Sequence, residues 1–173
     1  MDYLEAPFSE KETRKILDLV KQDDYSLNRA KAFRILSKDD YPFSMGYLED
    51  ILKQDSSANL ISSVLNFMHE KDPSLALSYA KTWRKSQSHM IEMIVMEIFA
   101  NVGGPEELLF FEERIPFKGP YQLYPVLISY VNLLRKQKDH KLVSGAQWLS
   151  EVLVQRNTNP YKRKIVRDAI VKI

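Results

Sequence analysis

The amino-acid sequence predicts an all-α protein of about ten helices that pack as antiparallel pairs. The chain has only five glycines and lacks the runs of alternating β-branched residues that are typical of strands. Apolar residues recur instead at spacings of three and four, which places them on one face of a helix. Residue types that begin and end helices recur along the whole chain. At 173 residues, the chain fits one domain spanning 1–173.

The expected helices follow from these local signals in order. The sequence from Ser9 to Glu12 has the form of a capping box, in which two side chains satisfy backbone N–H groups of the first turn. Asp72-Pro73 and Asn159-Pro160 each place a capping side chain before a proline, whose missing N–H costs nothing in the first turn. We expect helices at 9–21, 26–38, 43–54, 57–71, 73–85, 88–102, 105–114, 121–137, 139–157 and 160–172.

An apolar run from Met96 to Ile115 is interrupted by Gly103-Gly104-Pro105. This break predicts one helix that ends near Gly103 and a second that begins at Pro105. Glu106 and Glu107 then lie at the positive end of the second helix dipole, where carboxylates are stabilising. We expect the second helix to bury Leu108, Leu109 and Phe111.

The expected helices form a loose repeat. Taken in pairs, the second helices begin near residues 26, 57, 88, 121 and 160, at intervals of about 31 to 39 residues. The sequence markers of tetratricopeptide repeats do not recur at this period. The pattern therefore favours a HEAT-like array of irregular helical hairpins, an α-α superhelix in which each pair buries its apolar face against its neighbours.

The sequence contains no recognisable catalytic or metal-binding motif. It has no cysteine, and its histidines, His69, His89 and His140, are not spaced to share an ion. His69-Glu70 begins like the zinc motif HExxH, but the second histidine is missing. The acidic pairs at 106–107 and 112–113 point in different directions on a helix and are expected to be solvated. We expect no catalytic residue, no metal ligand and no cofactor in this chain.

Two groups of residues are candidates for contacts with a partner. Tyrosines follow Gly119-Pro120 on one helix and could line a concave surface, although packing between helix pairs also explains them; they are Tyr121, Tyr124 and Tyr130. Basic residues concentrate in 160–173, which carries a net charge of +4, five cations against Asp168. Four of these cations form a possible basic surface for phosphates or a solvated cap: Lys162, Arg163, Lys164 and Arg167. No aromatic residues alternate with them, so a nucleic-acid partner is not favoured.

The chain resembles a known family over about 24–173. "IFANVGGPEELLFFEERI" and "KGPYQLYPVLISYVNLLRKQ" are similar to the C-terminal helical domain of bacterial zinc aminopeptidases of the aminopeptidase N type, which are gluzincin metallopeptidases. In that domain a "YA..G....L.FFE" corner precedes a "G...Y......Y..FL" helix. "SLNRAKAFRIL" and "NPYKRKIVRDAIVKI" resemble its HEAT-like helices. The matching positions are Phe99, Ala100, Gly103, Leu109, Phe110, Phe111, Glu112, Gly119, Tyr124, Tyr130 and Leu134.

The resemblance implies that the chain is the C-terminal part of a larger enzyme. Zinc and the catalytic residues would belong to an upstream domain of the parent protein. This domain would contact the catalytic domain, close over its cavity and limit the access of peptide substrates. The alternative is a free-standing HEAT-like module that binds protein or nucleic acid. No segment resembles a membrane span or a signal peptide, so a cytoplasmic and a periplasmic location are both compatible.

Overall fold

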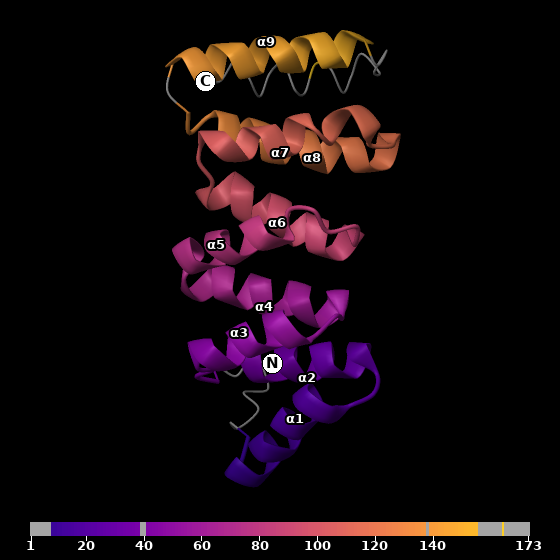
Figure 1. Cartoon of the computed structure of the whole chain (residues 1–173), viewed down its shortest axis with the longest axis vertical. Coiled ribbons are helices and arrows are strands. Elements are labelled where there is room, and N and C mark those ends of the chain that lie inside the picture. Colours follow the sequence, from indigo (N-terminus) through magenta and orange to yellow (C-terminus); the bar gives the residue numbers. More distant parts are fainter. Residues whose placement is uncertain (1–7, 39–40, 138, 156–163, 165–173) are drawn as a thin grey trace, which may run out of the picture. The chain divides into compact units, whose positions relative to one another are not determined.

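The computed structural model describes residues 8–38, 41–137, 139–155 and 164, and this part of the chain is an all-α helical array without strands (Figure 1). The α-helices are α1 (Glu10–Gln22), α2 (Ser26–Lys38), α3 (Met45–Gln54), α4 (Ala58–Lys71), α5 (Pro73–Trp83), α6 (His89–Val102), α7 (Leu108–Glu112), α8 (Pro120–Leu134) and α9 (Asp139–Gln155). Two short 3₁₀ helices, η1 (Pro105–Glu107) and η2 (Ile115–Phe117), flank α7. The expected all-α class is confirmed. The expected helix at 160–172 lies outside the described residues except for Lys164.

The chain divides into two compact units. Unit 1 comprises Met1–Asp72 and Ser86–Ile94, and unit 2 comprises Pro73–Lys85 and Val95–Ile173. Each has its own hydrophobic core.

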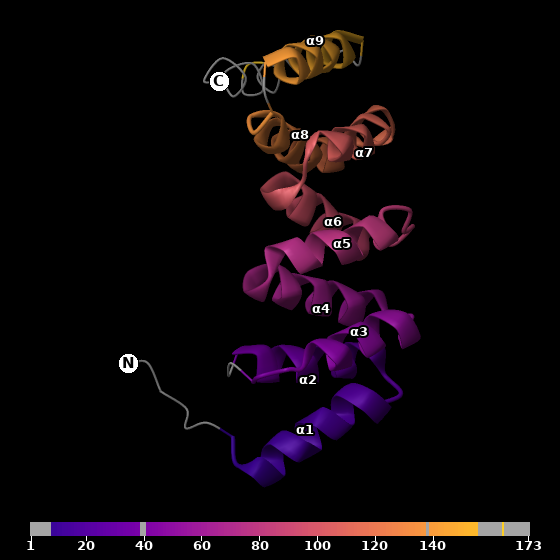
Figure 2. The same ribbon diagram turned by 60° about the vertical axis from the view of Figure 1, so that its left-hand side comes forward.

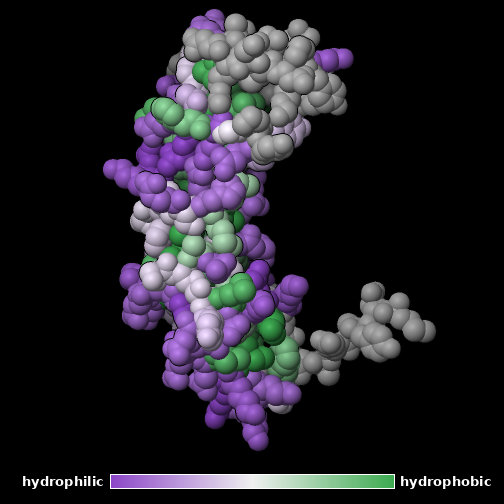
Figure 3. All heavy atoms as spheres, turned by 90° about the vertical axis from the view of Figure 1, so that its right-hand side faces the viewer, coloured by the Kyte–Doolittle hydropathy of each residue, from purple (hydrophilic) through white to green (hydrophobic). Residues whose placement is uncertain are grey.

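Unit 1 is built on the packing of α2 against α1 and α4, with α3 alongside α4 (Figure 2). Its centre holds Phe33, Phe43 and Phe67, with ring centroids 4.7 to 5.8 Å apart. The capping box expected at Ser9 is present, and Ser44 and Ser57 cap α3 and α4. In Figure 3, hydrophobic residues reach the surface at the level of α1 to α4, surrounded by hydrophilic ones.

A two-pronged ion pair joins α2 to the start of α4 within unit 1. Arg29 Nε and Nη2 donate to the two carboxylate oxygens of Asp55 at 3.0 and 3.2 Å, and both side chains are largely buried. Arg29 also donates to the Asp23 carbonyl, and Asp55 accepts from the Ser57 N–H. A buried ion pair is tolerated when further hydrogen bonds satisfy both charges, as they do here.

Unit 2 packs α7 and α9 against α8. Phe99, Phe110 and Phe111 form a continuous chain of edge-to-face rings that reaches Tyr130. Leu109 was expected in this core but is 52% exposed, whereas Leu108, Phe110 and Phe111 are buried. The expectation for Leu109 was therefore wrong, because a 3₁₀ turn precedes α7 and changes which residues face inward.

Two cationic side chains of unit 2, Arg114 and Lys136, donate hydrogen bonds to backbone carbonyls. Arg114 lies over the Phe110 ring, 3.8 Å from its centroid, and donates to the carbonyls of Phe110 and Arg84. Lys136 donates to the carbonyls of Ala100 and Asn101, the last turn of α6, where carbonyls lack helical partners. Hydrogen bonds from cations near a helix C-terminus also complement the helix dipole.

Candidate functional site

A groove of about 620 Å³ lies within unit 2. Its walls come from the end of α5, the corner at η1 and α7, and the first half of α9. The lining residues are Arg84, Pro105, Glu106, Leu108, Leu109, Glu112, Lys141, Ser144, Gly145 and Trp148.

The corner at 103–107 positions one wall of this groove. A Cβ on Gly103 would lie 2.5 Å from the Phe99 carbonyl oxygen, so only glycine fits there. Glu107 is buried and accepts a hydrogen bond from the Gly104 N–H at 2.7 Å. Lys81 of α5 forms ion pairs with Glu106 and Glu107. Glu107 was expected to be solvated, but its carboxylate is instead the buried cap of the corner, because the chain turns back over it.

The opposite wall is formed by α9, which packs against the buried hydroxyl of Tyr130. This hydroxyl donates to Glu112 Oε1 at 2.9 Å, and the Gly145 carbonyl oxygen lies 3.4 Å from it. The Trp148 ring lies 5.4 Å from the Tyr130 ring. A Cβ on Gly145 would lie 2.5 Å from Leu134 Cδ1 and 2.9 Å from the Tyr130 hydroxyl, so the glycine permits the close approach of α9 to α8. Burial, with Glu112 as a second cause, raises the pKa of Tyr130, which therefore remains a neutral donor.

The groove lining combines charged, polar and apolar side chains. The bond from Lys81 lowers the pKa of Glu106, so this carboxylate is charged and already paired. Ser144 donates to the Lys141 carbonyl. No group of three or more histidine, cysteine, aspartate or glutamate residues in the described part of the chain could hold a metal ion. The arrangement offers charges of both signs beside Leu109 and Trp148.

Unit 1 has a smaller cleft of about 260 Å³, lined by Leu17, Lys21, Tyr41, Pro42, Phe43, Ser44 and Tyr47. Three of these seven residues are aromatic. The Lys21 ammonium lies 5.4 Å from the centroid of the Tyr47 ring. The Tyr47 hydroxyl is buried and has no hydrogen-bond partner among the described residues. Burial, followed by the nearby Tyr41, raises the pKa of Tyr47 to about 12.

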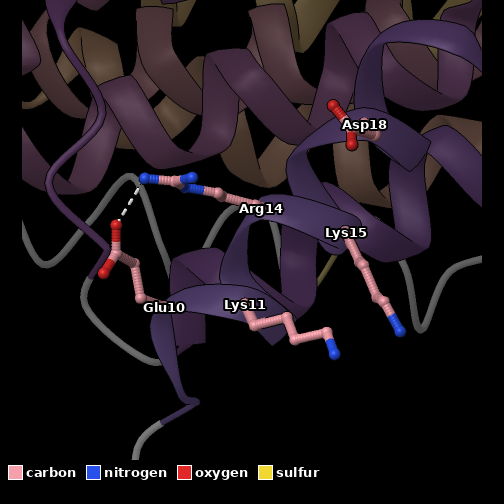
Figure 4. Close-up of a pocket in the computed structure, with 5 residues that line it drawn as sticks. All are labelled: Glu10, Lys11, Arg14, Lys15 and Asp18. Atoms are coloured by element: carbon pink, nitrogen blue, oxygen red, sulfur yellow. Dashed lines mark hydrogen bonds and ion pairs between the residues drawn. The ribbon is translucent and has the colours of Figure 1, made fainter.

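A further depression of about 380 Å³ lies on α1 alone (Figure 4). Glu10 and Arg14 form an ion pair, and Lys11 and Lys15 point away from it. All its lining residues come from one exposed helix face, so nothing converges on a ligand.

The candidate tyrosines of α8 occupy different environments. Tyr130 is fully buried and offers no contact surface, so packing between helices accounts for it and the expected partner contact does not. Tyr124 is 39% exposed and remains available to a partner. Tyr121 lies in α8, and its side chain is outside the described part. Of the candidate basic residues, Lys164 is exposed, whereas Lys162, Arg163 and Arg167 lie outside the described residues.

Sequence reasoning missed the groove in unit 2. Its members Arg84, Glu112 and Lys141 are far apart in the sequence and meet only through tertiary packing. One signal was present: Gly145 interrupts an otherwise helical pattern, which indicates a close approach of another segment.

No protein-family model, curated protein or solved structure matches the chain. Within the described residues, no helix is both long enough and apolar enough to cross a membrane.

Proposed function

We propose that the chain is the non-catalytic C-terminal helical domain of a zinc aminopeptidase of the aminopeptidase N type, and that it limits the access of peptides to the active site. The observation that carries the proposal is the packing of five of the residues on which the resemblance rests. Phe99, Phe110, Phe111, Tyr130 and Leu134 are all buried in unit 2. An unrelated sequence would not need to bring these spaced positions into one core.

Polar and backbone contacts connect the same positions. Glu112 accepts from Tyr130, and Gly103 occupies a place that has no room for a Cβ. The pattern is thus the signature of a structural corner followed by a supporting helix. It contributes no catalytic group, in keeping with a domain that acts on access while a metal elsewhere in the parent enzyme performs hydrolysis.

The first experiment identifies the native polypeptide. Antibodies against residues 1–173 should recognise a protein that is larger by at least a catalytic domain. The immunoprecipitate should cleave amino-acid anilides, and a chelator should abolish this cleavage. The chain alone should retain no zinc after dialysis and should cleave nothing. A native polypeptide of the same mass as the chain, without peptidase activity, would overturn the proposal.

The second experiment tests the effect on access. Deleting residues 26–173 from the parent should reduce its discrimination between short and long peptides while leaving its zinc content unchanged. Because deletion can impair folding, the milder variant Glu112→Gln, which alters the Tyr130 contact, should be tested for the same discrimination between short and long peptides. Its control is Glu113→Gln, at an exposed neighbour outside that contact. Discrimination that stays the same in a stably folded deletion variant would exclude the role in access.

A free-standing binding module is the second candidate. The unit 2 groove favours it, because the groove combines exposed apolar side chains with charges of both signs. The mass of the native polypeptide distinguishes the two candidates.

A further inference from the structure

Helix α2 has two faces of very different character. Its inner face buries Ala30, Ala32, Phe33 and Leu36. With successive residues about 100° apart on a helix, the exposed Leu27, Lys31, Arg34, Ile35 and Lys38 fall within an arc of about 100° on the opposite side. We call these five residues the basic stripe.

Among the described residues, the cations of the basic stripe have no acidic partner. Lys31, Arg34 and Lys38 form no ion pair within the described part of the chain, and α2 contains no acidic residue. By contrast, Arg29 on the inner side of α2 is paired with Asp55, and the outer face of α1 alternates cations with Glu10, Glu12 and Asp18. The lack of an acidic residue therefore sets the basic stripe apart from the neighbouring helix surface.

Two aliphatic side chains lie among these cations. Leu27 is 47% exposed and Ile35 is 45% exposed. Single exposed apolar residues are common on protein surfaces, but here they share one face with three unpaired cations. A partner that covers this face therefore gains from apolar contact as well as from charge.

This combination selects among anionic partners. A nucleic-acid backbone would use the cations but would find no counterpart for Leu27 and Ile35. A bilayer surface attracts basic residues but requires a broad apolar face for stable insertion. That broad face of α2 is already buried in unit 1.

We propose that the basic stripe is a docking surface for an acidic, partly apolar segment of a partner protein. Carboxylates of the segment pair with Lys31, Arg34 and Lys38, and its apolar side chains cover Leu27 and Ile35. The three cations span the eight residues from 31 to 38, about 10 Å along the axis, which two turns of an acidic amphipathic helix match. This surface belongs to unit 1 and does not depend on the proposed function, which rests on unit 2.

The experiment uses the whole chain and a defined probe. The probe is a fluorescent helical peptide of about 14 residues, roughly 20 Å long, with glutamates at spacings of three and four and two leucines on the same face. Its controls are a scrambled peptide of the same composition, duplex DNA, and phosphatidylcholine vesicles that contain phosphatidylserine. We expect the fluorescence anisotropy of the amphipathic peptide to rise and saturate as the chain is added. Binding should weaken at high salt, and each control should bind at least several-fold more weakly.

Matched variants locate the contact. The triple variant Lys31→Gln, Arg34→Gln, Lys38→Gln should weaken peptide binding by at least tenfold. The control Lys11→Gln, Lys15→Gln, Lys85→Gln removes the same charge from exposed positions elsewhere and should bind as the unmodified chain does. Leu27→Gln with Ile35→Gln should weaken binding about three- to tenfold at unchanged net charge, an effect that a purely electrostatic contact would not show.

Three outcomes would overturn the proposal. The first is tighter binding to DNA or to the vesicles than to the peptide, which would identify a different class of partner. The second is equal loss of binding in the two triple variants. The third is no saturable binding of the amphipathic peptide at millimolar concentration. Circular dichroism of every variant would show that loss of binding does not reflect loss of fold.

Discussion

Each unit of the chain has a cluster of aromatic rings that includes a tyrosine with a buried hydroxyl, Tyr47 in unit 1 and Tyr130 in unit 2, but the two hydroxyls have different surroundings. In unit 1, Tyr47 stacks on Phe43 at 5.7 Å, and its buried hydroxyl has no partner among the described residues. In unit 2, the Tyr130 hydroxyl donates to Glu112 and lies beside the Gly145 carbonyl. Contacts of the ring hold Tyr47 in place, namely Phe43 and the Lys21 ammonium, whereas a hydrogen bond of the hydroxyl to another segment holds Tyr130.

The difference matters because the two kinds of contact respond differently to change. Hydrophobic clusters tolerate repacking if their volume is kept. A buried polar contact requires its partners in place, since an unsatisfied group costs about 1–3 kcal/mol. Three kinds of substitution should therefore affect the stability of the two clusters differently: removing a core ring, adding a methyl group, and removing a single hydroxyl.

The largest effect is expected from removing a core ring. Phe33→Ala in unit 1 and Phe111→Ala in unit 2 should each lower the free energy of unfolding by about 3–5 kcal/mol, because both rings are fully buried. Urea denaturation measures the loss. Hydrogen exchange should show protection lost first in α2 to α4 for Phe33→Ala and first in α7 to α9 for Phe111→Ala. Equal loss throughout the chain in both variants would show that the two cores unfold as one.

A smaller effect, of opposite sign in the two units, is expected from adding a methyl group to a helical glycine. Gly145→Ala should destabilise by about 1–3 kcal/mol, because the new Cβ would overlap Leu134 and approach the Tyr130 hydroxyl. Gly46→Ala in α3 is the matched control: nothing lies within 4 Å of its added Cβ. It should stabilise by up to about 1 kcal/mol, since alanine favours helix more than glycine. Thermal denaturation of both variants would test the pair, and stabilisation by Gly145→Ala would contradict the close packing of α8 and α9.

Smaller still is the effect of removing one hydroxyl. Tyr130→Phe should lower the free energy of unfolding by about 1 kcal/mol, because Glu112 loses its donor. Tyr47→Phe should leave stability unchanged or raise it slightly, because the lost hydroxyl has no partner in the described structure. Denaturant midpoints at neutral pH would measure both. If Tyr47→Phe proved the more destabilising, the Tyr47 hydroxyl would have a partner in solution.

Local features of this fold could be predicted from the sequence, and long-range ones could not. The capping box at Ser9 and the break at Gly103-Gly104 act on adjacent residues, so helix ends were found within a few positions. The inward-facing residues of α7 were partly wrong, because sequence spacing did not reveal the short 3₁₀ turn that shifts Leu109 outward.

The candidate site was harder to predict because its contacts join distant segments. The sequence left Tyr130 as either a possible contact residue or part of the packing between helix pairs, and it could not indicate that the hydroxyl meets Glu112, 18 residues away, inside unit 2. Lys136 reaches the end of α6, 36 residues away. Spacing within one helix cannot indicate such partners, because tertiary packing decides which helices meet.

The last expected effect is a difference in ionisation, which is absent at neutral pH and develops only at high pH. Burial raises the pKa of Tyr47 to about 12, above the value of about 10 expected in the unfolded chain. Between these values the folded state binds more protons at this site than the unfolded state, so the contribution of Tyr47 to stability is present below pH 10 and declines as the pH rises towards 12. The loss of stability over this range should be smaller in Tyr47→Phe than in the unmodified chain, as measured by urea denaturation at several pH values. Tyr25, which is 75% exposed, supplies the control Tyr25→Phe, and an equal decline in all three proteins would show that Tyr47 titrates like an exposed tyrosine.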